Sequence, residues 1–268
     1  MIGKPLSPSV FFFVMVLSFS VLLGGYTYLA REQHKINPLD KTIPTWSQLG
    51  QGVVKIVVLD HRSGKRWIVE DSAESGKRLF LGFFWGILGA ILIGLLIGCF
   101  QLLEAAFAPP LAILAKLPPT AALALFFVML GTGTGMYVGI IVVGLLPALA
   151  QSIYLSIKAI PTELINKALT LGASRTELVW NIIIRYIFPN ILDSIRLQIG
   201  PALVYLIAAE YACAQIGFGY RIRLQARLVN MDVVYPYLAL LILFGFFMDW
   251  LLKKAQAKWC AWYVKKEN

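Results

Sequence analysis

The longest uncharged stretch of this 268-residue chain constrains its fold more than any other feature. The 41 consecutive residues 117–157 include no Asp, Glu, Lys or Arg. Because a helix needs roughly 20 apolar residues to cross a bilayer, this stretch is too long for one crossing and nearly right for two. Gly131, Gly133 and Gly135 lie near its middle and predict the turn between two helices. The chain is therefore expected to be a membrane protein.

Composition agrees with this expectation. Hydrophobic residues make up 59% of the chain and charged residues 14%, with a mean hydropathy of +0.74. A soluble domain has about 45–50% hydrophobic and about 25% charged residues. An ordinary soluble or disordered protein is therefore excluded. The net charge is +10, but Lys and Arg are spread over several loops. Lipid headgroups are therefore the expected anionic neighbour, and no nucleic acid is expected as a partner.

Further apolar stretches bring the expected number of membrane helices to six. They are Ser9–Leu29, Leu79–Phe100, a segment around Arg196–Glu210, and Val233–Leu252. Ser9–Leu29 is longer than the apolar part of a signal peptide. Leu79–Phe100 has glycines in two GxxxG registers, which allow helices to approach closely. The predicted fold class is an all-α membrane protein with six transmembrane helices.

The third span, the first helix of the uncharged stretch, is expected to be broken. It begins near Pro109 and Pro110 and contains Pro118 and Pro119. Proline removes a backbone donor, and irregular backbone is tolerated in a membrane only against protein or a water-lined path. We therefore take Pro118, Pro119 and Thr120 as pathway candidates, with a kink used only for packing as an equal alternative.

The fifth span is short and bounded by ionisable residues. Only 13 uncharged residues separate Arg196 from Glu210, and Pro201 lies among them. Ionisable residues within a membrane are candidates for function. Glu210 and Pro201 are therefore pathway or gate candidates, although capping or bracing the outer end of the bundle is the favoured role for Glu210. Arg196 is expected to meet headgroups or a loop.

The remaining polar segments give weaker signals. Residues 31–78 suit either short amphipathic helices or a hairpin built on Val53–Leu59 and Trp67–Val69. His34 and His61 lie in this segment without a second metal ligand at useful spacing, so no metal site is expected. The lysine-rich tail 253–268 resembles an interfacial anchor. Cys99, Cys213 and Cys260 form no disulfide pattern and are interpreted as packing residues.

The segment after the fourth span, 158–188, is helical by period and unusually polar. Pro161 can start a helix and Thr162 can cap it, and its apolar face lies opposite Glu163, Asn166 and Lys167. The apolar residues are Leu164, Ile165, Ala168, Leu169 and Leu171. Gly172 should end this helix, and Ser174 should cap the next one in a capping box with Glu177.

This unit of helix, glycine and helix resembles the EAA loop of the membrane subunits of ABC importers. Matching stretches follow in the same order along the chain, and they are closest to the permeases for sulfonates, taurine and nitrate. They include Leu117–Ala121, Gly131–Gly133, Leu171–Arg175, Pro189–Leu192, Ala208–Glu210 and Gly217–Tyr220. The family's Glu-Ala-Ala is Asn166-Lys167-Ala168 here, which leaves Glu163 as a possible substitute for the missing glutamate.

The resemblance implies a type I ABC importer permease fold and a non-catalytic subunit. Two copies would form the pathway, an external binding protein would deliver the solute, and ATPase subunits would bind ATP and magnesium, with no cofactor in this chain. The ATPases would dock on a short cytoplasmic coupling helix. The residues implied in docking are Pro161, Thr162, Glu163, Ile165, Asn166, Ala168, Leu169, Gly172, Ala173, Ser174 and Arg175.

The organisation that follows has four parts. A first span (1–30) precedes an extracytoplasmic polar segment (31–78), a permease core (79–252) and a basic cytoplasmic tail. The tail lysines weakly favour cytoplasmic termini, and the resemblance implies the inner membrane. The main alternative is a channel or ion-coupled transporter, although no internal repeat is visible. An intramembrane enzyme is disfavoured because the spans lack His.

Overall fold

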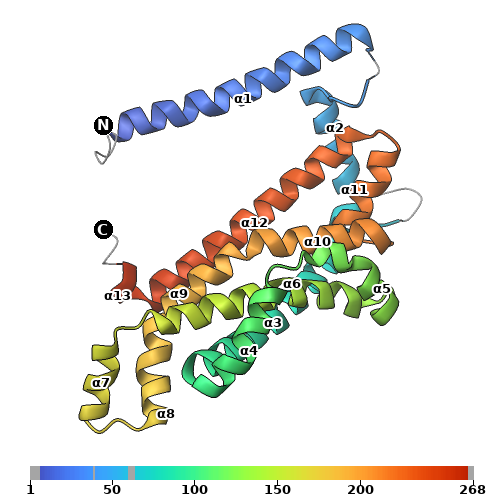
Figure 1. Cartoon of the computed structure of the whole chain (residues 1–268). Coiled ribbons are helices and arrows are strands. Elements are labelled where there is room, and N and C mark those ends of the chain that lie inside the picture. Colours follow the sequence, from blue (N-terminus) through green and yellow to red (C-terminus); the bar gives the residue numbers. More distant parts are fainter. Residues whose placement is uncertain (1–6, 39, 60–63, 265–268) are drawn as a thin grey trace. The chain divides into compact units, whose positions relative to one another are not determined.

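The computed structural model describes residues 7–38, 40–59 and 64–264, which divide into two compact units. The first comprises 1–67 and 224–238, and the second comprises 68–223 and 239–268. Among the described residues, the only strand-like pairing is an isolated bridge between Leu59 and Arg66. The predicted all-α class is confirmed (Figure 1).

The first unit contains α1 and α2 together with the end of α11 and the start of α12. The bounds are α1 Pro8–Ile36, α2 Trp46–Val57, α11 Phe218–Arg227 and α12 Met231–Trp259. The other elements are α3 Trp67–Cys99, α4 Gln101–Leu114, the 3₁₀ helix η1 Pro119–Ala122, α5 Leu123–Leu130, α6 Thr134–Lys158, α7 Thr162–Thr170, α8 Arg175–Glu177, the π-helix η2 Leu178–Ile183, α9 Ile184–Leu197, α10 Ile199–Cys213 and α13 Ala261–Val264.

Within the residues that the structure describes, there are six candidate membrane spans if one bent pair is counted as a single span. Five helical segments, including 175–213, are long and apolar enough to cross a membrane, and α4 with η1 and α5 forms a sixth that is bent by 82°. The break lies at residues 115–118, immediately before Pro119, as the prolines predict. However, α4 begins at Gln101 and contains Pro109 and Pro110, so the expectation that this span begins at those prolines is wrong.

The second span also begins earlier than hydropathy predicts. The helix α3 starts at Trp67 rather than at Leu79, because Asp71, Ser75 and Arg78 form one helical face that is buried within the second unit. The polar segment 31–78 therefore contains the end of α1, the amphipathic helix α2 and the start of α3. Of the two alternatives for this segment, the short helices are correct, and the hairpin is reduced to the bridge at Leu59.

The two histidines do not share one loop as the sequence suggested. His34 lies in the last turn of α1, where its ring contacts the Ala30 carbonyl at 2.8 Å and Gln48 Oε1 at 3.1 Å. His61 lies outside the described residues.

The helix α6 forms the centre of the second unit. Its large side chains are buried along most of its length, including Met136, Ile140, Leu145 and Leu149, each 0% exposed. The helices α4, α5, α9 and α10 all pack against it. A helix that buries residues around its whole circumference is shielded from lipid, so α6 is an internal helix of the bundle.

The glycines of α3 allow α6 to approach closely. An added Cβ at Gly82 would lie 2.7 Å from Ile141 Cβ, and one at Gly94 would lie 2.8 Å from Ile153 Cβ. Gly86 and Gly98 face Leu145 and Ile157 in the same way. The GxxxG registers thus make a helix contact, as the sequence predicted.

We expect Gly94→Ala to weaken this contact. Its Cβ would meet both Ile153 and the Ala150 backbone oxygen at 2.9 Å, and backbone cannot move aside cheaply. Overpacking of this kind costs about 1–3 kcal/mol, measurable as a lower Tm of the protein in detergent. Gly76→Ala in the same helix is the control, because its Cβ would meet nothing within 4 Å. An equal Tm for the two variants would contradict the prediction.

Candidate functional site

The predicted coupling segment forms a short helix, a sharp stop and a second helix. The helix α7 starts at Thr162, and Pro161 occupies the N-cap position without a side-chain cap. The expectation that Thr162 caps this helix is therefore wrong. Pro161 has φ −57° and ψ 131°, and its carbonyl accepts the first helical hydrogen bond from Leu164 N at 3.1 Å.

Gly172 stops α7 as predicted. Its φ is +87°, a left-handed conformation that glycine adopts without steric cost. Gly172 N donates to Leu169 O at 3.0 Å and Ala173 N donates to Ala168 O at 3.1 Å, which is the Schellman arrangement. The next helix then begins with the expected capping box, in which Glu177 N donates to Ser174 Oγ at 3.2 Å and Ser174 N donates to Glu177 Oε2 at 2.8 Å.

The apolar side of α7 is used partly within the chain. Ala168 is 8% exposed, and Ile165 packs against the hydrophobic core. Leu169 and Leu171 remain 46% and 80% exposed, and Trp180 on η2 is 65% exposed. The polar residues of α7 are exposed as well. The surface available to a partner is therefore a polar helix face bordered by leucines, rather than one continuous apolar face.

A polar contact fixes the end of α6, just before this segment. Glu104 on α4 accepts hydrogen bonds from Tyr154 at 2.7 Å and from Lys158 at 2.6 Å, both on α6. Lys158 is the last residue of α6. The coupling segment therefore starts from a point that is held to α4.

The pathway candidates at the broken span differ in exposure. Pro118 is exposed, Thr120 is half-buried and Pro119 is buried. An added Cβ at Gly144 of α6 would lie 2.8 Å from Pro119 Cγ and also clash with the ring of Tyr205 of α10. Pro119 thus packs in a notch that a glycine leaves in α6.

The fifth span is part of a nearly continuous helical segment, 175–213, which contains η2 and has a break at Gln198. Pro201 lies in the first turn of α10, where its missing N–H costs least. Arg196 forms ion pairs with side chains of the helical bundle. Its guanidinium donates to Asp249 Oδ1 at 2.8 Å and to Asp193 Oδ1 at 3.1 Å, which links α9 to α12.

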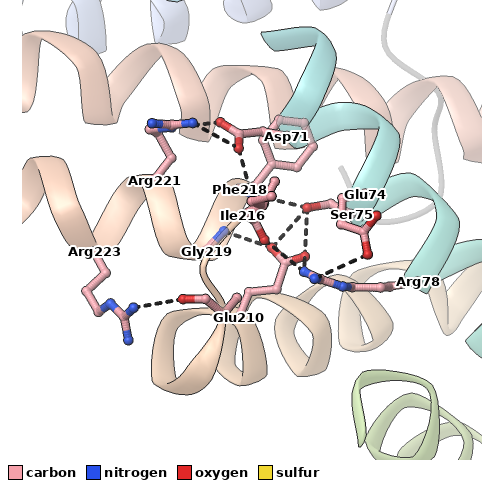
Figure 2. Close-up of polar contacts among 12 residues, drawn as sticks. Asp71, Glu74, Ser75, Arg78, Glu210, Ile216, Phe218, Gly219, Arg221 and Arg223 are labelled. Atoms are coloured by element: carbon pink, nitrogen blue, oxygen red, sulfur yellow. Dashed lines mark hydrogen bonds and ion pairs between the residues drawn. The ribbon is translucent and has the colours of Figure 1, made fainter. Parts of the chain in front are cut away.

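Glu210, the other candidate of this span, lies at the centre of a buried network (Figure 2). The residue is 0% exposed. Its carboxylate accepts hydrogen bonds from Ser75 Oγ at 2.7 Å and Arg78 Nη1 at 2.8 Å, both on α3, and from Gly219 N at 2.9 Å. Glu210 therefore joins α10 to α3 and to the start of α11.

The start of α11 points its backbone amides at three side chains. Gly217 N donates to Asp71 Oδ1 at 3.0 Å and Phe218 N donates to Ser75 Oγ at 3.0 Å, beside the bond from Gly219 N to Glu210. Gly217 has φ +124°, and a Cβ there would crowd the Glu210 carboxylate. A helix N-terminus favours negative charge, and here the chain supplies that charge itself.

Two arginines balance the two carboxylates. Arg221 Nε donates to Asp71 Oδ2 at 2.9 Å. Arg78 lies 4.1 Å from the ring centroid of Tyr137 on α6 and also donates to Ile216 O at 2.9 Å. The Gly217–Tyr220 stretch is packed against the protein rather than being a solvated loop, because Phe218 is only 8% exposed. The network is a rigid polar brace across α3, α6, α10 and α11.

Sequence reasoning missed the α3 half of this brace. Asp71, Ser75 and Arg78 occupy positions i, i+4 and i+7, which is one helical face. This spacing was the available signal, but hydropathy assigned the residues to a polar segment. Among the described residues, no group of three or more His, Cys, Asp or Glu side chains is placed to hold a metal ion.

Removing one partner of the brace should destabilise the protein strongly. Glu210→Ala leaves the buried Arg78 with only the more distant, partly exposed Glu74 as its charged partner, at 3.3 Å, and removing one partner of a buried pair costs about 3–5 kcal/mol. Arg78→Met with Glu210→Leu should recover part of this loss, because neither charge then remains. Thermal unfolding in detergent measures both effects.

The exposed pair Glu32 and Lys35 is the matched control, with 44% and 70% exposed side chains. Glu32→Ala should change the Tm little, because exposed pairs contribute about 0–1 kcal/mol. A Glu210→Ala variant as stable as Glu32→Ala would show that the brace carries no stability.

Comparisons with known proteins agree with this architecture. The chain is 30% identical over 197 residues to a putative ABC transporter permease protein of Methanocaldococcus jannaschii, covering 73% of each protein. It is 26% identical over 191 residues to the taurine transport system permease protein of Escherichia coli, covering 71% of this chain and 70% of that one.

A solved structure shares the fold. The chain resembles a chain of the inward-facing MetNI methionine ABC transporter with a TM-score of 0.62 and 16% identity, over 72% of this chain and 96% of that one. The family model for the inner membrane component of binding-protein-dependent transport systems matches residues 86–258. This chain is therefore a multi-pass membrane permease that belongs to the family of binding-protein-dependent transport system inner membrane components.

Proposed function

We propose that this permease works as one of two identical copies that form a pathway for a small anion such as a sulfonate, taurine or nitrate. An external binding protein delivers the solute, and two ATPase subunits supply the energy. Support for the solute class comes from the taurine permease relative and from the residues that resemble the sulfonate and nitrate branch. The sequence carries no GxxxxGK[ST] motif, so ATP and magnesium belong to the partner subunits.

The observation that carries the coupling role is the geometry of α7 and its stop. A nine-residue helix with exposed leucines at its edge lies between two membrane segments, and a Schellman motif ends it. Such a compact helix fits a groove on a partner subunit. The proposed docking residues are those of 161–175 that the resemblance implies, to which the structure adds Leu171 because of its exposure.

The proposed mechanism follows from the contacts at the two ends of the segment. When the ATPases close, they would move α7, and the movement would pass into α6 through Lys158 and into α9 through α8 and η2. The pathway would then change from inward-open to outward-open. The proposed topology places both termini in the cytoplasm, α7 on the inner side and the Glu210 brace on the outer side.

The contacts of the brace indicate the role of Glu210. Ser75, Arg78 and Gly219 already occupy its carboxylate oxygens. We therefore assign Glu210 to holding the outer end of the bundle rather than to binding solute. Pro118 and Thr120, at the break between α4 and α5, remain the proposed pathway positions.

A substitution at Leu171 tests the docking proposal. Leu171→Asp places a charge on an 80% exposed side chain, so the fold should persist while apolar docking is lost. We expect tagged permease from native membranes to lose at least about 90% of its co-purifying ATPase, a change equivalent to about 1.4 kcal/mol in binding. ATP-dependent uptake should fall in parallel.

Leu171→Met is the matched control and should retain the ATPase, because it keeps an apolar side chain of similar size. Equal membrane yields of the two variants confirm that folding is unaffected. An Asp variant that retains full ATPase binding and uptake would contradict the docking proposal. If the unaltered permease retained no ATPase, a channel or ion-coupled transporter would be favoured instead.

A further inference from the structure

The helix α2 has three distinct faces. Its inner face consists of the buried Gly52 and Ile56 and the half-buried Leu49, and its polar face includes Ser47 and Gln51. The third face is apolar and exposed, at positions i, i+4, i+7, i+8 and i+11. It consists of Trp46, Gly50, Val53, Val54 and Val57.

The exposed apolar face is too large to belong to an ordinary water-exposed helix. Trp46 is 53% exposed, Val54 is 58% exposed, and Val58 and Leu59 continue the same surface beyond the helix at 51% and 49%. A helix with one strongly apolar and one polar side is typical of a membrane interface.

The first end of α2 is fixed at the boundary of the first span. Trp46 Nε1 donates to Thr27 Oγ1 at 3.1 Å, and Tyr26 donates to Pro44 O at 2.5 Å. Thr27 lies near the end of the uncharged part of α1, four residues before Arg31, which is about 6 Å along a helix. The start of α2 therefore lies at the depth where the apolar part of α1 ends.

The second end of α2 is fixed at the boundary of another span. Lys55 Nζ donates to Asp232 Oδ2 at 2.7 Å, and Gly52 lies directly against the Asp232 carbonyl, where a side chain would not fit. Asp232 is in the first turn of α12, immediately before the apolar run that starts at Val233. Both ends of this helix, about 18 Å long, are thus attached to residues at membrane boundaries.

An aromatic cluster marks the same level. Tyr26 lies 5.3 Å from Trp46 and 6.4 Å from Tyr235, measured between ring centroids, and both contacts are edge-on. Tryptophan and tyrosine concentrate where the bilayer core meets the headgroups. Lys55, nine residues after Trp46, is half-exposed beside Asp232, where a cation can meet lipid phosphate.

From these contacts we propose that α2 lies in the plane of the membrane interface, with its exposed apolar face in the lipid. The occupant of that face is lipid at the boundary of headgroups and acyl chains. The assignment of this interface to the outer leaflet rests on the proposed topology. The position of α2 itself requires only that the end of α1 and the start of α12 lie on the same side of the membrane.

The two attachment points decide the orientation. A helix that stood upright on the membrane would leave one end far from any boundary residue, whereas α2 contacts Thr27 near its start and Asp232 near its end. Lying flat, it places the apolar face toward the acyl chains and Gln51 toward water.

The test uses bimane fluorophores on single cysteines in the full-length protein, reconstituted in liposomes. The background carries Cys99→Ser, Cys213→Ser and Cys260→Ala. The labelled variants are Val54→Cys on the apolar face and Gln51→Cys on the polar face of the same helix, which serves as the matched control. Both native side chains are exposed, so neither change disturbs packing.

We expect lipids brominated in their acyl chains to quench the label at position 54 at least about twofold more than the label at 51, because interfacial helices bury their apolar face about 5–10 Å deep. Aqueous iodide should show the opposite order. Val57→Cys provides a second apolar position and should behave like Val54→Cys.

Two outcomes would overturn the proposal. Equal quenching by iodide at 54 and 51 would place the face in water. Protection of position 54 from both quenchers would indicate that protein, such as a second copy, covers it. Neither outcome depends on uptake or on ATPase binding, so a failure here is distinguishable from a failure of the proposed transport function.

Discussion

The bilayer provides no hydrogen-bond partners for a charged or polar group, and this constraint determines where the charges of this protein lie. Arg78, Glu210, Asp71 and Arg221 are all buried, and each has a partner of opposite charge. Their partners come from helices far apart in the sequence, so the charges also fix which helices meet. The break at residues 115–118 leads directly into η1, whose Pro119 packs against α6.

Close packing within the second unit depends on the smallest side chains. The glycines of α3 face the isoleucines and leucines of α6, and Gly144 of α6 accommodates Pro119 and Tyr205. Without a strong hydrophobic driving force between helices in lipid, such surface matching supplies much of the association energy. The polar brace and the glycine contacts are thus complementary, since one specifies which helices pair and the other allows them to approach.

Local features of this chain could be predicted from sequence, and contacts between distant segments could not. The break near Pro118, the stop at Gly172 and the capping box at Ser174 each depend on a few adjacent residues. The partner of Arg196 is Asp249, 53 residues later, and no local pattern identifies it. The start of α3 was missed because hydropathy averages over charges and does not register that Asp71, Ser75 and Arg78 share one helical face.

The π-helix η2 has a mechanical consequence for the coupling segment. It lies between α8 and α9, where six residues have wider turns than an α-helix allows. The π-helix is rare, and it occurs mainly as short bulges at functional sites. Trp180 is 65% exposed, whereas Val179 packs against the hydrophobic core and Ile183 belongs to it. In the proposed mechanism, movement of α7 would reach α9 through these wider turns, and the buried Ile183 at the end of η2 would carry it into the hydrophobic core.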